Sequence, residues 1–333
     1  MTRQIFRNLA LSLTLLGVAF SASLSSAQGG LAAKLPGARE ASPRSPAASH
    51  QKQTPGSPSY TYTLLSFPAT LSTLVTGINP GATTAKTYVV GGYGPDVDFT
   101  EGGFLVLLSR TKTISETYEA VNYPHIPKNQ IAADVNDLGQ VVGTYVDSSG
   151  VGHGYVWSGG KFTTLNVPFA GATGTFPQGI NNSDEVVGCW DDSAENSHGF
   201  TLIGSTYASF DYPGGSQTCG FDVNNAGNIV GSYQDASGVY NGYLLSGGTY
   251  TSFAVPGAVE TSASGLNDVG DIVGSYQDAS GVYNGYLLSG GVFTTIALPG
   301  EVYTILTDIS NNGVVVGYYQ DAAGLIVSFL ATP

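Results

Sequence analysis

Positive charge is scarce in this sequence and missing from its second half. Of 333 residues, 11 are Lys or Arg and 24 are Asp or Glu, which gives a net charge of −13. No Lys or Arg follows Lys161, whereas 15 acidic residues do. A surface of this sign repels the phosphate backbone of nucleic acids and anionic lipid headgroups. The sequence therefore argues against nucleic acid and against a membrane surface as partners.

Helical periodicity and long apolar runs are also missing after the N-terminal 27 residues. We expect no transmembrane segment there, because a spanning helix needs about 20 consecutive apolar residues. No window has apolar residues at helical spacing, which favours an all-β fold. The sequence contains no nucleophile elbow, phosphate-binding loop or zinc-spaced His/Cys set, so the usual signatures of several enzyme classes are lacking.

The N-terminus has the parts of a secretory signal peptide, residues 1–27. Arg3 and Arg7 give a positive start, and residues 9–20 form an apolar stretch that is short for a bilayer. Small residues precede Gln28, where cleavage is expected, and no cysteine is available there for lipid attachment. The alternative is a membrane anchor. Residues 28–58 are rich in Pro, Ser and Ala, a composition typical of a disordered spacer.

Residues 59–333 consist of one repeated unit. The twenty residues 229–248 recur letter for letter as 272–291, an offset of 43 residues. Weaker copies share an N-x-x-G turn followed by two β-branched residues and a glycine. That glycine marks six units, at Gly91, Gly143, Gly188, Gly231, Gly274 and Gly317. Self-similarity at this period predicts a circular or stacked array of supersecondary units.

Each unit predicts four short strands. In the fifth unit, residues 264–266 and 272–276 form a hairpin around an Asn turn, and residues 285–288 and 292–298 supply two more strands. Six such units predict an all-β fold, a six-bladed β-propeller of four-stranded antiparallel blades. Residues 60–68 match a fourth strand and the chain ends on a third. We therefore expect the N-terminal strand to complete and close the last blade.

The two cysteines fall on neighbouring units. Cys189 follows the repeat glycine of the third unit, and Cys219 lies on the first strand of the fourth. A disulfide is compatible with an exported chain. The alternative is that blade packing leaves the two residues beyond bonding reach.

An aromatic residue stands two positions after each repeat glycine. These residues are Tyr93, Tyr145, Trp190, Tyr233, Tyr276 and Tyr319. They could stack on sugars, or pack between blades with their polar tips hydrogen-bonded. Recurrence in every unit favours packing, because a repeat preserves its packing first.

An acidic turn between the second and third strands recurs as well. It contains Asp147, Asp192, Asp235, Asp278 and Asp321. Each turn offers one carboxylate, whereas calcium takes six to eight oxygen ligands. Calcium at these turns is therefore the less favoured interpretation, and we expect no other cofactor and no metal centre.

Two units depart from the repeat and are the candidate binding regions. The third unit gathers ionisable and aromatic residues in one loop: Trp190, Asp191, Asp192, Glu195 and His198. Paired carboxylates can perform acid–base chemistry on glycosides, but a solvated loop is the simpler explanation. The first unit carries insertions that include Arg110 and Lys112, and insertions in one repeat are typical of binding loops.

Residues 265–274, with their Asn turn and repeat glycine, and the later H-G-F or N-G-Y and P-G segments resemble the HAF-type extracellular repeat of bacteria. The resemblance covers residues 60–333 and implies an exported, tandemly repeated protein, secreted or periplasmic. Several units have Asn where the family has His, as at Asn241 and Asn284. The resemblance implies no activity.

The sequence thus predicts a secreted or cell-surface binding or scaffold module, monomeric, with an extracellular protein or glycan as its partner. The alternative is a carbohydrate-active enzyme on the same scaffold, a glycoside hydrolase or polysaccharide lyase, with the acids of the third unit as its catalytic groups.

Overall fold

The computed structural model describes residues 60–65, 72–83, 85–94, 101–109, 115–298, 300–322 and 324–333. The predicted signal peptide, residues 1–27, and spacer, residues 28–58, lie outside these ranges, as do Arg110 and Lys112. All the secondary-structure elements in the described ranges are β-strands. None of the described residues belongs to a helix with the length and hydropathy to cross a membrane.

The strands form five sheets, of which two come from the first half of the repeats. The first four-stranded sheet contains β2 (Ser72–Ile78), β3 (Thr87–Gly94), β4 (Gly102–Ser109) and β5 (Ser115–Val121). The eight-stranded sheet contains β6 (Gln130–Val135), β7 (Val141–Val146), β8 (Gly152–Ser158), β9 (Lys161–Leu165), β10 (Gly174–Ile180), β11 (Val186–Asp191), β12 (Ser197–Ile203) and β13 (Thr206–Phe210).

The remaining sheets have four strands each. One contains β14 (Ser216–Val223), β15 (Ile229–Gln234), β16 (Tyr240–Ser246) and β17 (Thr249–Phe253). The next contains β18 (Glu260–Leu266), β19 (Ile272–Gln277), β20 (Tyr283–Ser289) and β21 (Val292–Ile296). The last contains β22 (Tyr303–Ile309), β23 (Val315–Gln320), β24 (Ile326–Thr332) and β1 (Thr61–Leu65).

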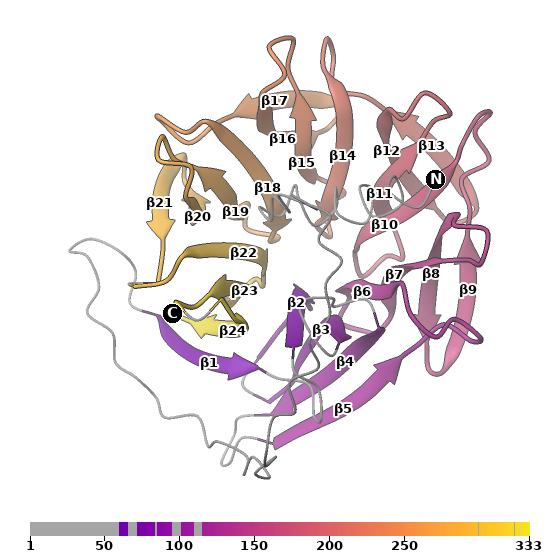
Figure 1. Cartoon of the computed structure of the whole chain (residues 1–333), viewed down its shortest axis with the longest axis horizontal. Helices are drawn as coiled ribbons and strands as arrows, with labels where there is room; N and C mark the ends of the chain where they lie inside the picture. Colours follow the sequence, from indigo (N-terminus) through magenta and orange to yellow (C-terminus); the bar gives the residue numbers. More distant parts are fainter. Residues whose placement is uncertain are drawn as a thin grey trace, which may run out of the picture.

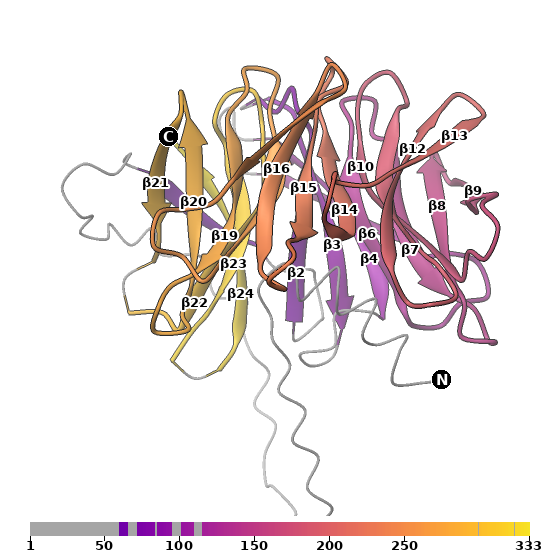
Figure 2. The same cartoon turned by 90° about the horizontal axis from the view of Figure 1, so that it is seen from above.

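The sheets stand around a common axis as a β-propeller (Figure 1). The first strand of each repeat lies near the axis and the fourth lies at the rim, and the side view shows a disc one strand length thick (Figure 2). Because successive strands are antiparallel, alternate turns fall at opposite ends of the disc. We call the end with the Asn turns the asparagine face. The end with the Asp turns is called the acidic face.

The N-terminal strand completes the last sheet, as the sequence predicts. β1 pairs antiparallel with β24 at its outer edge, with Thr63 opposite Leu330. The edge of Tyr62 packs against the ring of Phe329 at a centroid distance of 5.5 Å. The first and last strands in the described ranges therefore share one sheet, in which β1 covers the outer edge of β24.

The Asn turns are linked from one repeat to the next. Asn224 Oδ1 accepts hydrogen bonds from the backbone N–H of Ala226 (3.1 Å) and Asn228 (3.0 Å), while Gly227 takes a φ of 75°. Asn224 Nδ2 donates to the carbonyl of Asn267 in the next turn, at 3.1 Å. The same bond joins Asn136 to Asn181, Asn181 to Asn224, and Asn267 to Ser310. This one side chain both shapes its turn and couples neighbouring repeats.

The core lies in the layers between sheets. Fully buried tyrosines of the third strands reach back to the first strands: Tyr243 donates to the carbonyl of Cys219 (2.9 Å) and Tyr286 to that of Ser262 (3.0 Å). The repeat glycine permits this close approach, because a Cβ on Gly231 would lie 1.9 Å from the carbonyl oxygen of Cys219. Its recurrence is therefore steric.

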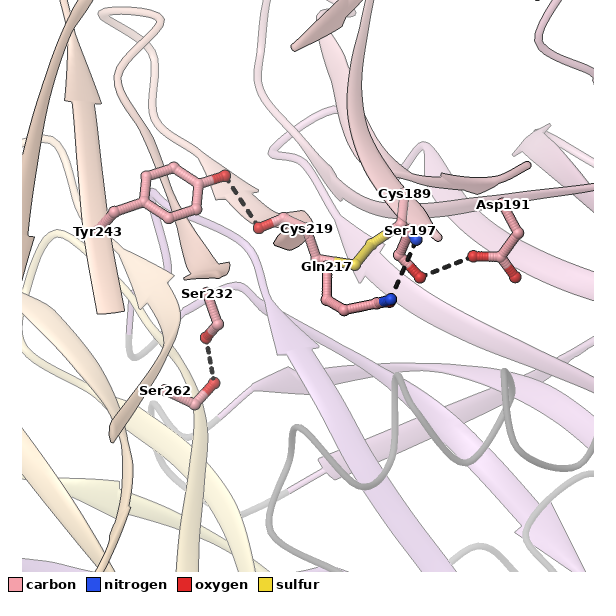
Figure 3. The surroundings of a disulfide bond; sticks show 8 residues. All are labelled: Cys189, Asp191, Ser197, Gln217, Cys219, Ser232, Tyr243 and Ser262. Carbon is pink, nitrogen blue, oxygen red and sulfur yellow. Dashed lines mark hydrogen bonds between the residues drawn. A yellow bond between two sulfur atoms is a disulfide. The ribbon is translucent and has the colours of Figure 1, made fainter. Parts of the chain in front are cut away.

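Cys189 in β11 and Cys219 in β14 form a disulfide, with their Cα atoms 5.0 Å apart (Figure 3). The described residues contain no free cysteine. Both residues are buried, and the bond joins the third repeat to the fourth. A cross-link that closes a loop of about 30 residues stabilises a fold by roughly 3–4 kcal/mol, mainly by restricting the unfolded chain.

Candidate functional site

The candidate site of the third repeat is built on a tight turn after β11. Asp192 Oδ1 accepts hydrogen bonds from the backbone N–H of Ala194 (2.8 Å) and Asn196 (2.9 Å). Its Oδ2 accepts from Asn196 Nδ2 at 3.0 Å. The Asn196 side chain and backbone, with smaller contributions from Ala194 and His198, lower the pKa of Asp192 to about 2. This carboxylate stays ionised at neutral pH and is engaged within its own turn.

His198 is held between two carboxylates and an indole ring. Its Nδ1 lies 2.9 Å from Asp211 Oδ1, and its Nε2 lies 3.4 Å from Asp192 Oδ2. The imidazole stacks on Trp190 at a centroid distance of 4.5 Å. Trp190 is buried and donates through Nε1 to Ser209 Oγ at 2.9 Å. The ring of His198 is therefore fixed in position on both of its nitrogens and on one face.

Asp191 lies apart from this group, in the layer between the third and fourth repeats. It is buried and its Oδ1 accepts a hydrogen bond from Ser197 Oγ at 2.7 Å (Figure 3). Desolvation raises the pKa of Asp191 to about 6, partly offset by the bond from Ser197. Ser197 N–H also donates to Gln217 of β14, which ties this end of β12 to the next sheet.

Glu195 occupies the left-handed position of the turn, with a φ of 69°. Its backbone N–H donates to the carbonyl of Asp192 at 3.1 Å, and its side chain is exposed. The structure thus brings Trp190, Asp192 and His198 into one contact network, while Asp191 points into the interface between repeats and Glu195 serves the turn through its backbone.

The same arrangement recurs in units that follow the repeat closely. In the second repeat, His153 stacks on Tyr145, and its Nε2 lies 3.1 Å from Asp147 Oδ2. In the fourth, Asn241 Nδ2 donates to Asp235 Oδ2 at 3.2 Å. In the fifth, Asn284 and Asp278 form the same pair. The contact of a His or Asn with the turn Asp is therefore a property of the repeat.

Three of the recurring aromatic residues, Tyr145, Trp190 and Tyr233, are buried in the propeller, whereas Tyr93, Tyr276 and Tyr319 are half-buried. Tyr233 is buried, stacks on Tyr212 at a centroid distance of 3.5 Å and hydrogen-bonds Ser252. Tyr145 is buried and stacks on Tyr123 in the same way, at 3.8 Å. The buried rings of Tyr145 and Tyr233 do not offer an open face to a sugar, which favours the packing interpretation at these two positions.

The Asp turns do not converge on a common point. Across the part of the chain that the structure describes, no group of three or more His, Cys, Asp or Glu side chains could hold a metal ion. The donor set at each Asp turn is one carboxylate whose Oδ1 already accepts a backbone N–H bond, which is a poor match for the six to eight oxygens that calcium takes.

Three buried carboxyl groups near the axis were missed by the sequence analysis. Asp222 Oδ1 accepts the N–H of Val223 (2.7 Å) and its Oδ2 accepts that of Leu266 in the next repeat (2.6 Å). Asp134 bridges Val135 and Ile180 in this way, and Asp308 bridges Ile309 and Ile78. Each of these acids therefore links the first strands of two repeats.

The signal for these acids is an alternation at one repeat position. Successive units carry Gly77, Asp134, Gly179, Asp222, Gly265 and Asp308. A Cβ on Gly77 would lie 2.7 Å from Asp134 Oδ1, and one on Gly265 would lie 2.7 Å from Asp308 Oδ1. Every second unit thus has glycine at this position, which leaves room for the aspartate of the next unit. Burial raises the pKa of all three acids, to about 6 for Asp222.

Solved structures provide the comparison. The chain is similar to a mutant of AofleA from Arthrobotrys oligospora, with a TM-score of 0.51 and 13% identity over 83% of this chain and 88% of that one. It is also similar to a lectin from Aleuria aurantia with a six-bladed β-propeller fold (TM-score 0.49, 12% identity, 78% and 91% covered). A third is TolB from Acinetobacter baumannii (TM-score 0.47, 13% identity, 78% and 63% covered).

Neither a protein-family model nor a curated protein matches this sequence. At 13% identity, the likeness to AofleA shows the fold alone. Together with the sheet arrangement, it establishes that the chain is an all-β protein of the β-propeller type.

Proposed function

We propose that this protein is an exported, six-bladed β-propeller that binds an extracellular partner and performs no chemistry. The observation that carries the proposal is the engagement of Asp192. Its carboxylate is used by its own turn and by His198, in an arrangement that Asp147 and His153 repeat one unit earlier. A catalytic centre would set its unit apart from the others, whereas this one follows the repeat.

Two features support six blades. The eight-stranded sheet divides into two antiparallel halves, β6–β9 and β10–β13, that are joined by one parallel pair, Gly174 with Gly152. In addition, the Asn turns form a chain of hydrogen bonds that returns to its start: Asn311 N–H donates to the carbonyl of Pro80 at 2.8 Å, and Asn79 Nδ2 donates to Asp137 Oδ1 at 2.7 Å. Each half of the eight-stranded sheet is one blade of the ring.

Export is supported by the leader-like N-terminus and by the disulfide, which persists in oxidising compartments. The resemblance to HAF-type repeats points to a bacterial protein at the cell surface, in the periplasm or in the medium. The strongly negative second half keeps such a domain soluble and monomeric.

A binding screen tests the proposal. The full chain is applied to an array of glycans and to immobilised extracellular proteins, with and without calcium. We expect retention of a defined ligand without its consumption. A ligand that is bound and then released in altered form would contradict a purely binding role.

A second candidate function, a carbohydrate-active enzyme, is favoured by one observation. Asp191 and Asp192 are adjacent, and their surroundings push their pKa values apart, to about 6 and about 2. Such a separation is what an acid and its partner carboxylate need. The test is turnover of a polysaccharide panel by the full chain and by Asp191→Asn. Cleavage that disappears in the variant would establish the enzyme, and no cleavage by either supports the binding module.

A further inference from the structure

We propose that the acidic face docks a cationic, amphipathic peptide segment of a partner protein, through an arc of acid–aliphatic pairs from the last three repeats. The inference rests on the proposed binding function and names the class of partner. The arc consists of residues 235–239, 259–260, 278–282, 301–302 and 321–325, without residue 323.

These segments share one end of the propeller. Residues 235–239, 278–282 and 321–325 are the turns between second and third strands. The connections between repeats lie beside them, because Val259 N–H donates to the carbonyl of Gln277 at 2.8 Å and Val302 N–H donates to that of Gln320 at 2.9 Å. Each connection therefore adjoins the end of a second strand, next to the turn that follows it.

Each segment pairs an acid with an aliphatic residue. In the turns the pair is closed by hydrogen bonds: Asp278 N–H donates to the carbonyl of Val282 (2.9 Å), and Val282 N–H donates to Asp278 Oδ1 (3.1 Å). The two side chains are thus neighbours by construction. The five pairs are Asp235 with Val239, Val259 with Glu260, Asp278 with Val282, Glu301 with Val302, and Asp321 with Leu325.

The aliphatic members of the pairs are open to solvent. Val259 and Val302 are each 50% exposed and Leu325 is 59% exposed. With Val151, the acidic face carries six of the eleven large hydrophobic residues that are exposed in the described ranges. The remaining five include Leu138, Val269 and Val292 at the asparagine face, so the arc is marked by five exposed aliphatic residues in adjoining segments of consecutive repeats. Aliphatic groups that adjoin in this way and are rimmed by polar groups are typical of a contact surface.

The acidic members of the arc differ in how they are engaged. Glu260 accepts a hydrogen bond from the Tyr283 hydroxyl and desolvation raises the pKa of Glu301, so the negative charge of the arc comes chiefly from its Asp turns. Backbone N–H groups of Val239 and Ser237 lower the pKa of Asp235, and chiefly that of Val282 lowers the pKa of Asp278, so both remain ionised in mildly acidic media. No Lys or Arg follows position 161. The field over the arc is negative, which repels anionic glycans and phosphate groups and attracts a cationic partner.

The alternation of charge and apolar surface specifies the partner further. A peptide that presents Lys or Arg beside Leu or Val can pair its cations with the acids while it covers the aliphatic side chains. A purely polar polycation would leave the aliphatic members exposed, and a neutral apolar peptide would leave the negative charge of the arc uncompensated.

The experiment titrates the full chain into fluorescein-labelled peptides and records anisotropy at low and at physiological salt. The probe is a 12-residue peptide of alternating Lys and Leu, and the comparison peptides replace Leu by Ser or Lys by Glu. We expect binding of the Lys/Leu peptide, with the Lys/Ser peptide at least about tenfold weaker, since it buries no aliphatic surface, and no binding of the Glu/Leu peptide.

Variants locate the contact. The triple substitution Val259→Ser, Val302→Ser and Leu325→Ser should weaken the Lys/Leu peptide by about tenfold, because the lost contacts are apolar. Asp278→Asn should weaken it by a few fold at low salt and less at high salt. The matched control places serine at two exposed valines of the asparagine face, Val269 and Val292, and should leave binding unchanged.

Equal binding of the Lys/Leu and Lys/Ser peptides would overturn the inference, as would an effect of the control that equals that of the triple variant. A chain that retains a glycan on the array yet binds no Lys/Leu peptide would refute this inference and leave the proposed binding function in place. Polysaccharide cleavage that is lost in Asp191→Asn would refute the proposed function instead. The peptide titration would still show whether the arc binds the Lys/Leu peptide.

Discussion

Ser232 and Ser262 make at one interface between repeats the contact that Cys189 and Cys219 make at the preceding one. The two hydroxyl oxygens lie 2.9 Å apart in a buried site, where the disulfide of the neighbouring interface has its sulfur atoms (Figure 3). Ser232 is the repeat counterpart of Cys189, and Ser262 is that of Cys219. The geometry that admits a disulfide is therefore a property of the repeat.

We predict that the double variant Ser232→Cys, Ser262→Cys forms a second disulfide. It closes a loop of the same length as the native one, so the expected gain in unfolding free energy is up to about 3 kcal/mol. The measurement is intact mass with and without alkylation, followed by chemical unfolding. Either single variant serves as the control, and a double variant with two free thiols under oxidising conditions would contradict the prediction.

Removing the native disulfide should leave the fold intact but lower its stability. Cys189→Ser with Cys219→Ser recreates the Ser–Ser pair, and the loss of loop constraint lowers the unfolding free energy by roughly 3 kcal/mol. The midpoint of urea unfolding measures this, compared with the native chain in reducing and oxidising buffer. A midpoint equal to that of the oxidised native chain would show that the bond contributes nothing.

Stability should fall as pH rises from about 4 to about 6. The pKa of Asp222 is about 6 when folded, above its ordinary value of 3.8, because the group is desolvated. An acid with a raised folded pKa contributes stability that is present below its unfolded pKa and is lost as pH rises through the folded one. For Asp222 this amounts to about 3 kcal/mol. Asp134 and Asp308, whose pKa values are also raised, extend the loss to higher pH.

Scanning calorimetry across this pH range checks the sign. The turn carboxylates with lowered pKa values, such as Asp192, are ionised in both states over most of this range and contribute little to the slope. Asp222→Asn should be less stable near pH 5, where it loses a hydrogen-bond acceptor, and should show a shallower decline. A transition temperature that rises with pH would contradict the claim that the buried acids near the axis have raised pKa values.

The repeat glycine should tolerate no side chain. Gly231→Ala places a Cβ against the carbonyl oxygen of Cys219 and should cost more than about 3 kcal/mol. Gly248→Ala is the control: its φ of 79° is strained for alanine, but no atom lies within 4 Å of the added Cβ. Only about 1 kcal/mol is expected there. Equal losses in the two variants would mean that backbone strain, and not the close approach, explains the glycine.

Much of the architecture can be predicted from the sequence, because aligning the copies of the repeat with one another shows which residues are equivalent. Aligning Cys189 with Ser232 places the two cysteines on adjacent units, and matching residues 60–68 to a fourth strand predicts the pairing of β1 with β24. Both inferences need the repeat alone.

The electrostatics at the axis depend on the three-dimensional arrangement. The alternation of Gly and Asp is visible in the letters, but Asp222 meets Leu266 only when the first strands stand side by side around the axis. The loop of the third unit is a similar case. Asp191 and Asp192 are adjacent in the sequence. Asp191, the last residue of β11, points into the buried interface between repeats, whereas Asp192 lies in the turn that follows.

The most direct test of the closed propeller is hydrogen–deuterium exchange of β24 in the full chain and in a variant that lacks only residues 60–65. In the full chain, the β24 amides that face β1 should be protected as well as those that face β23. In the variant, the first group should exchange rapidly while the amides of β12, whose neighbour β13 is retained, keep their protection. Unchanged protection of the β1-facing amides in the variant would contradict closure of the last sheet by the N-terminal strand.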